Sequence, residues 1–170
     1  MTNLYINRTS NIRKTWLLIT VFLLFVVGFG WFLSYWFQNP GILFIAVIFS
    51  FFMSFASYWW SDKLVLAMSH AKPMKEEDAS ELYQIVESLS KTADLPMPKI
   101  YIIEEQAMNA LATGRNSKHA VVAVTRGLLE KLEPKELEGV LAHELSHIGN
   151  HDMLISSVVV VLAGIVVMAA

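Results

Sequence analysis

The fold is decided first by residues 16–37, WLLITVFLLFVVGFGWFLSYWF, a run of 22 residues without a charge. At a rise of about 1.5 Å per residue, a helix of this length is about 33 Å long, enough to cross a bilayer core of about 30 Å. Residues 41–60 form a second uncharged run, and residues 38–41, QNPG, supply the breakers of a turn between the two runs. We therefore predict a transmembrane helical hairpin over residues 16–60.

The tryptophans support a membrane location for this region. All five lie in it, most of them near the ends of the two runs, at the depth where aromatic side chains meet lipid headgroups. A cleaved signal peptide is the alternative for the first run, but its apolar core has only about 7–15 residues and ends at a small-residue cleavage site. The first run is longer, is bulky to its end and is followed at once by a second run, so we favour the membrane hairpin.

Most charged residues lie in a body between apolar segments. The 170 residues are 55% hydrophobic and 16% charged, whereas a typical globular chain has about 25% charged residues. No charge lies between Lys14 and Asp62 or after Asp152, and the stretch 62–152 has a net charge of −5 from ten basic and fifteen acidic residues. This pattern excludes a disordered chain, a coiled coil and a nucleic-acid binder of the basic-patch type. The absence of cysteine excludes disulfide scaffolds and thiolate metal sites.

Basic residues flank both ends of the hairpin and are absent from its turn. They are Arg8, Arg13 and Lys14 before the first run, and Lys63, Lys72 and Lys75 after the second. Because positive charges favour the cytoplasmic side of a membrane, we expect residues 1–15 to be a cytoplasmic N-terminus. By the same argument residues 61–152 form a cytosolic domain.

Residues 153–170 form a third uncharged run, and the chain ends inside it. Eighteen residues of helix reach only about 27 Å, which is barely a crossing. We therefore expect the start of a third transmembrane helix in a chain that is truncated at its C-terminus. An incomplete record and a natural truncation both remain open.

The charged body has the pattern of an α+β fold. Apolar residues three and four apart indicate helices, and short β-branched runs indicate strands. The predicted elements are a helix over residues 75–91, strands over 99–103, 109–114 and 120–124, one or two helical turns over 126–132, and a longer helix that begins at Pro134. We expect a small mixed sheet packed on these helices.

The helix after Pro134 carries the sequence HELSH at residues 143–147. Two histidines four residues apart lie one helical turn apart and are rotated by only about 40°, so both imidazoles can reach one zinc ion. Glu144, the next residue round the helix, can take a proton from the water that attacks a peptide carbonyl and pass it to the leaving amine. We predict His143 and His147 as metal ligands and Glu144 as the catalytic base. The alternative is a helix with two solvated histidines.

Two longer segments resemble the HtpX-like membrane zinc metalloproteases, relatives of the CAAX prenyl proteases. Residues 143–152, HELSHIGNHD, are similar to the family's active-site helix, in which HExxH is followed by an Asp five residues on. Residues 109–116, NALATGRN, are similar to its NAFATGR segment, with Leu111 where Phe is usual. Residues 120–125 and 127–129 continue the similarity, which covers nearly the whole chain.

The resemblance implies a zincin-like protease domain, incomplete here, over residues 61–152. It implies a zinc-dependent, multi-pass endopeptidase of the cytoplasmic membrane with its catalytic site in the cytosol. Its substrates would be damaged or misfolded membrane proteins, as in membrane-protein quality control. Asp152 would orient a histidine or a loop, and residues 109–114 would border the cleft and pair with an extended substrate.

The family's third zinc ligand is a Glu on a later helix, beyond two further apolar spans, and this chain does not contain that region. Catalytic zinc needs three protein ligands and a water. His151 is too far along and round the helix to replace the missing ligand, and Met153 stands where a metzincin has a third histidine. We do not expect the remaining candidates to be ligands: Glu104, Glu105, His70 and His119.

Two functions therefore remain open. The chain is the front part of a membrane zinc endopeptidase that is active in its complete form, or it is a catalytically inactive truncated form that acts as a membrane-anchored binding protein. In both cases the expected partners are the lipid bilayer and membrane proteins, and not nucleic acid.

Overall fold

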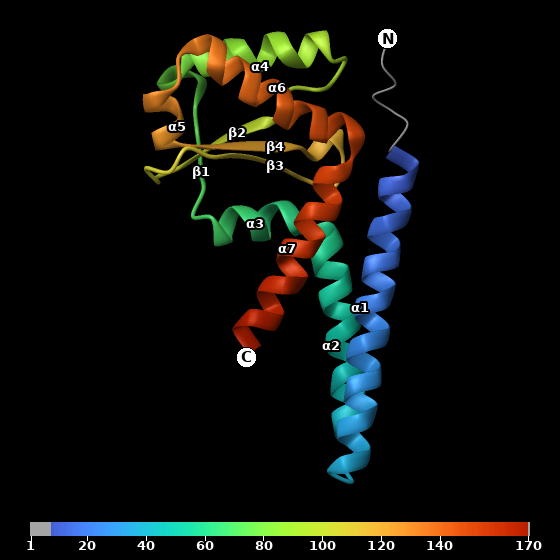
Figure 1. Cartoon of the computed structure of the whole chain (residues 1–170). Helices are drawn as coiled ribbons and strands as arrows, with labels where there is room; N and C mark the ends of the chain where they lie inside the picture. Colours follow the sequence, from blue (N-terminus) through green and yellow to red (C-terminus); the bar gives the residue numbers. More distant parts are fainter. Residues whose placement is uncertain (1–7, 170) are drawn as a thin grey trace.

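Two long apolar helices form a hairpin that projects from a body of strands and helices (Figure 1). The computed structural model describes residues 8–169, with side chains for residues 9–163. Helix α1 spans Arg8–Trp36 and α2 spans Pro40–Trp59, and both are long and apolar enough to cross a membrane. The predicted hairpin of two apolar helices is confirmed. The start of α1 lies eight residues before the predicted run, because its first two turns extend along the body and bury polar side chains there.

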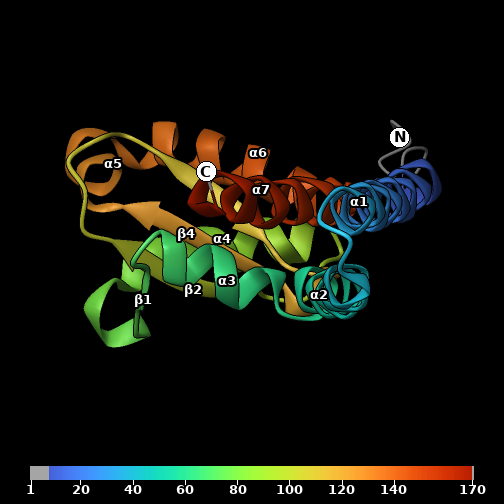
Figure 2. The ribbon, with the colours of Figure 1, turned by 90° about the horizontal axis from the view of Figure 1, so that it is seen from below.

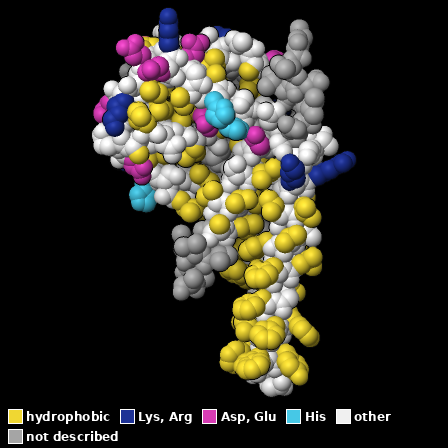
Figure 3. All heavy atoms as spheres, in the orientation of Figure 1, with side chains coloured by type: hydrophobic (Ala, Val, Ile, Leu, Met, Phe, Trp, Pro, Cys, Tyr) yellow, Lys and Arg dark blue, Asp and Glu magenta, His cyan; other side chains and the backbone are white. Residues whose placement is uncertain are grey.

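The turn and the packing of the hairpin follow from a few small residues. The Asn39 side chain accepts a hydrogen bond from the Gly41 amide at 2.9 Å, and Pro40 occupies the first turn of α2, where its missing N–H is not needed. Gly30 of α1 lies so close to Ala46 of α2 that any side chain at position 30 would collide with it. Hydrophobic side chains cover the outside of the hairpin, whereas charged side chains gather on the body (Figure 3).

A four-stranded mixed sheet forms the centre of the body. Its strands are β1 (Lys72–Pro73), β2 (Lys99–Ile103), β3 (Ala110–Thr113) and β4 (Val121–Thr125), in the order β1-β2-β4-β3. Strands β2 and β4 are parallel and the other pairs are antiparallel. The three predicted strands are confirmed. Strand β1 was not predicted, because a two-residue strand that contains a proline has no recognisable pattern.

Helices cover both faces of the sheet (Figures 1 and 2). Helices α4 (Ser80–Thr92) and α6 (Pro134–Asn150) pack on one face, α3 (Ser61–Met68) packs on the other, and α5 (Arg126–Lys131) follows β4 directly. The main core joins the first face to α4 and α6 through buried side chains that include Val86, Val122, Val124, Leu141 and Ile148. The expected α+β architecture is therefore present.

The predicted helix over residues 75–91 is wrong at its start. Residues Glu76–Asp78 form a separate 3₁₀ turn, η1, and α4 begins only at Ser80. The cause is Ala79, whose backbone is not helical (φ −155°, ψ 55°) and interrupts the helix. Glu81 is the acidic residue in the first turn of α4.

Helix α7 (Asp152–Ala169) leaves α6 at an angle of 90°. His151, between them, has a left-handed backbone (φ 58°) and ends α6. Ile19 of α1 packs against Leu154, Val158 and Leu162 of α7. Within the described residues, α7 has the length and hydropathy of a membrane span only when it is taken together with α6. The third transmembrane helix therefore stays a prediction; residues 1–7 and 170 lie outside the described part of the chain.

Candidate metal centre

The two histidines of the HELSH sequence face each other near the end of α6. Their Nε2 atoms are 3.2 Å apart, and their ring centroids are 4.7 Å apart with the ring planes nearly perpendicular. His143 is exposed and His147 is half-buried, so the pair opens to the outside of the body. The four-residue spacing brings the rings together as the helix geometry predicts.

Asp152 fixes the orientation of His147. Its Oδ2 lies 2.9 Å from Nδ1 of His147. Because a carboxylate only accepts hydrogen bonds, Nδ1 is the protonated nitrogen and Nε2 keeps its lone pair free for a metal. The other carboxylate oxygen of Asp152, Oδ1, is buried and makes no hydrogen bond with the described residues.

Glu144 lies beside the histidine pair and is half-buried. Burial raises the pKa of its carboxyl group above the ordinary value, because the charged form loses hydration. His147 and His143 oppose this shift, as does a hydrogen bond that the carboxylate accepts from the Ala112 amide. A carboxylate in this position is placed to accept a proton and return it.

Strand β3 lies next to this group at the edge of the sheet. The Ala112 amide of β3 reaches Glu144, and the Thr113 hydroxyl lies 2.7 Å from that of Ser157 in α7. Gly114, just after β3, has φ 137°, a conformation in which a side chain would collide with His119 and Ala120. The predicted segment 109–114 is therefore a strand beside the site that ends in a turn.

One group of ligand atoms could hold a metal ion in the described part of the chain. It consists of His143, Glu144 and His147, whose ligand atoms all lie within 4.8 Å of one another. Bonds from zinc to nitrogen are about 2.0–2.1 Å long, so two tetrahedral ligands are about 3.3 Å apart. The Nε2 separation of 3.2 Å matches this value. The residues present therefore fit a zinc ion.

The residues that we did not expect to be ligands lie outside this group. Glu104 forms an ion pair with Arg126 at 2.9 Å, and His119 contacts Arg115 and Asn116. His151 is buried at the end of α6, with Nδ1 3.4 Å from the Gly149 carbonyl oxygen.

Sequence reasoning missed two contacts of this region. They are the hydrogen bond from the Ala112 amide to Glu144 and one from the Asn11 side chain to the Asn150 carbonyl. The first joins a strand to a helix and the second joins residues 139 positions apart, so neither leaves a local signal in the sequence.

Comparison with known proteins gives a consistent result. The model of "Peptidase family M48" matches residues 76–170. Three similar proteins, each named "Protease HtpX homolog", come from Syntrophobacter fumaroxidans, Thermococcus sibiricus and Campylobacter curvus, with 53%, 47% and 48% identity over 74%, 91% and 94% of this chain. The aligned regions cover 45%, 53% and 54% of those proteins, so the chain spans about half the length of the curated relatives it matches.

Proposed function

The chain belongs to peptidase family M48 and is HtpX-like, and from this premise we propose that it carries the membrane hairpin and the active-site helix of a zinc-dependent endopeptidase. The main support is the pair of Nε2 atoms 3.2 Å apart beside Glu144. This arrangement supplies two metal ligands and a carboxylate base on one helix.

Each side chain of the group has a separate task in this proposal. His143 and His147 would hold the zinc ion through Nε2, and the Asp152 carboxylate holds the His147 ring by its Nδ1–H. Bound zinc would lower the pKa of water and polarise the scissile carbonyl. Glu144 accepts a proton on its carboxylate from the attacking water and donates it to the leaving nitrogen. The Ala112 amide holds the Glu144 carboxylate near the histidines.

The site needs a third protein ligand to hold zinc firmly. The family resemblance assigns this role to a glutamate on a helix after residue 170, and we propose that it completes the site. Residues 109–114 would border the cleft. An extended segment of substrate would add to the open edge of β3 by backbone hydrogen bonds.

The charge pattern supports the proposed location. Basic residues flank the hairpin on one side only, which favours a cytoplasmic position for residues 1–15 and for the domain 61–152. We propose a multi-pass protein of the cytoplasmic membrane, with residues 16–60 as its first two spans and residues 153–170 as the start of a third. Its substrates would be damaged or misfolded membrane proteins, which such an enzyme reaches from the cytosolic side.

The test compares the 170-residue chain with one extended downstream, both in detergent. We expect about one zinc per extended chain, weaker binding by the shorter chain and loss of zinc in His143→Ala. The extended chain should digest casein, and Glu144→Gln should abolish digestion while zinc stays bound. Glu138→Gln, an exposed position on the same helix, is the matched control. Digestion that survives Glu144→Gln would refute the proposed mechanism, and zinc-free chains that bind membrane proteins without cutting them would favour the binding-protein alternative.

A further inference from the structure

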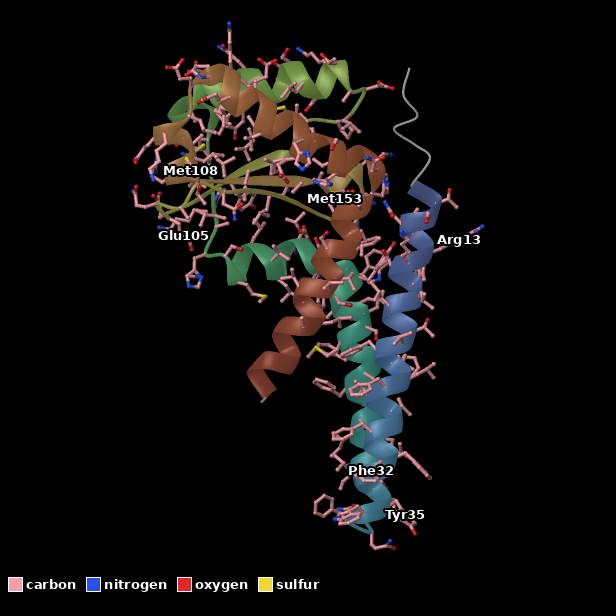
Figure 4. All side chains as sticks on the ribbon, in the orientation of Figure 1. Arg13, Phe32, Tyr35, Glu105, Met108 and Met153 are labelled. Carbon is pink, nitrogen blue, oxygen red and sulfur yellow. The ribbon has the colours of Figure 1, made fainter. Side chains whose placement is uncertain are left out.

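A side chain of the first membrane helix contacts the end of the active-site helix. Nδ2 of Asn11 donates a hydrogen bond of 3.1 Å to the main-chain carbonyl of Asn150. Asn11 is only 7% exposed, whereas its neighbour Ser10 and the cations Arg13 and Lys14 face outward. The side chain of Arg13 projects away from the body in Figure 4. Asn11 therefore marks the face of α1 that meets the body.

The carbonyl that Asn11 contacts lies at a point where the backbone lacks helical partners. The last carbonyls of a helix have no amide of their own helix to accept from. Asn150 is the last residue of α6, and the chain then turns through His151 and starts α7 at 90°. The Asn11 amide satisfies this carbonyl and so ties the bend to α1.

The same bend determines where Asp152 lies. Asp152 is two residues after Asn150, and its Oδ2 accepts the hydrogen bond from Nδ1 of His147 at 2.9 Å. Met153, the next residue, is 2% exposed and packs into the main core. It is labelled in Figure 4, where it lies at the bend. A shift of the bend would thus move the carboxylate away from the His147 ring.

Further contacts hold α1 against this region. Thr15, one turn further along α1, is also buried, and its hydroxyl donates to the Asn11 carbonyl of the same helix at 3.0 Å. One turn beyond, Ile19 packs on Leu154 and Val158 of α7. Asn11 is therefore the polar end of a continuous contact between α1 and the start of α7.

We propose that Asn11 is a positioning residue of the metal centre. By its hydrogen bond to the Asn150 carbonyl it holds the bend at His151, and through the bend it holds Asp152 against His147. The first membrane helix is then part of the site, in addition to being an anchor. The inference rests on the proposed function in one respect: His147 is taken to be a metal ligand.

The first measurement is zinc affinity, by competition with a chromophoric chelator, in the detergent-solubilised chain. Removal of a group that orients a metal ligand lowers affinity by about 10–100-fold, and we expect about 10-fold for Asn11→Ala. Ser10→Ala, an exposed neighbour on the same helix, should change nothing. If Asn11→Ala does not fold, Asn11→Gln, which alters the reach of the amide, takes its place under the same criteria.

The second measurement asks whether Asn11 acts through Asp152. In a chain that already carries Asp152→Asn, Asn11→Ala should lower zinc affinity further by less than about twofold. The reason is that the two substitutions interrupt the same chain of contacts. A 10-fold loss that persists in this background would overturn the proposal. So would an Asn11→Ala affinity within twofold of the unchanged chain.

A third measurement does not depend on zinc. In the metal-free chain, the ¹⁵N shifts of the His147 ring should show a proton on Nδ1, and Asn11→Ala should give a mixture of the two tautomers. An unchanged ring spectrum would refute the positioning role. If the unchanged chain binds zinc no better than His143→Ala, the proposed function fails, and the ring spectrum alone then decides the role of Asn11.

Discussion

The His147 ring and the Asp152 carboxylate are joined across the bend between α6 and α7, with Nδ1 2.9 Å from Oδ2. The ring belongs to the last turn of α6, and the carboxylate is the first residue of α7. The orientation of a proposed metal ligand therefore depends on the path by which the chain leaves its own helix.

Asp152→Asn should weaken zinc binding by about 10-fold, because a neutral amide oxygen is a poorer acceptor for the His147 Nδ1–H than a carboxylate. Calorimetric titration with zinc measures the effect. Lys135→Gln, at an exposed position near the start of α6, should bind as the unchanged chain does. Equal affinity of Asp152→Asn and the unchanged chain would show that the contact does not support metal binding.

Gly30→Ala should destabilise the hairpin by about 1–3 kcal/mol, the usual cost of overpacking. A Cβ at position 30 would collide with the Ala46 side chain and force α1 and α2 apart. Gly28→Ala is the matched control, because a Cβ there has no neighbour within 4 Å. In thermal unfolding in detergent, the melting temperature of Gly30→Ala should be below that of the unchanged protein, and that of Gly28→Ala should be equal or higher. The reverse order would contradict the packing described.

Leu141→Ala should lower the free energy of unfolding by about 2–5 kcal/mol, since it removes a fully buried side chain between α6 and the sheet. Denaturant titration monitored by far-ultraviolet circular dichroism would measure the decrease in the free energy of unfolding. Met97→Ala, where the side chain is 41% exposed, should cost much less. Comparable losses at the two positions would mean that α6 does not pack as described.

Arg126→Gln should raise the pKa of Glu104. The guanidinium hydrogen-bonds the carboxylate through two contacts of 3.1 and 2.9 Å and holds the pKa of Glu104 below its ordinary value. Because the folded pKa is below the unfolded one, the pair contributes to stability above the ordinary carboxyl pKa. That contribution is lost as the pH falls through the lowered pKa. A ¹³C titration of the Glu104 carboxyl should show the upward shift in Arg126→Gln, and an identical curve in both proteins would refute it.

Much of the fold was predictable because its signals are local. The uncharged runs indicate the hairpin, and the β-branched runs indicate β2 and β4, which pair in parallel over residues 99–103 and 121–125. The four-residue spacing of His143 and His147 likewise determines that their rings meet. Helix α3 gave no such signal, since its eight residues are too few to establish a periodic pattern.

The contacts that complete the site could not be predicted, because they depend on tertiary structure. The Ala112 amide reaches Glu144 only when β3 forms the sheet edge, and Asn11 reaches Asn150 only when α1 docks on the body. The break at Ala79 also overrode a run of acidic residues that suits a helix start. The spacing in the sequence predicts the histidine pair, whereas tertiary packing determines which groups surround it.

The sharp turn at His151 has an electrostatic consequence. Peptide dipoles along a helix add up to a partial negative charge at its carboxyl end, and the effect is confined to the last turn. Because α7 leaves α6 at 90°, the peptide dipoles of the two helices are not aligned. The partial negative charge therefore remains at the carboxyl end of α6. His147 lies in the last turn of α6, so the backbone itself makes this corner of the protein attractive to a cation, by about 0.3–1 kcal/mol per unit charge.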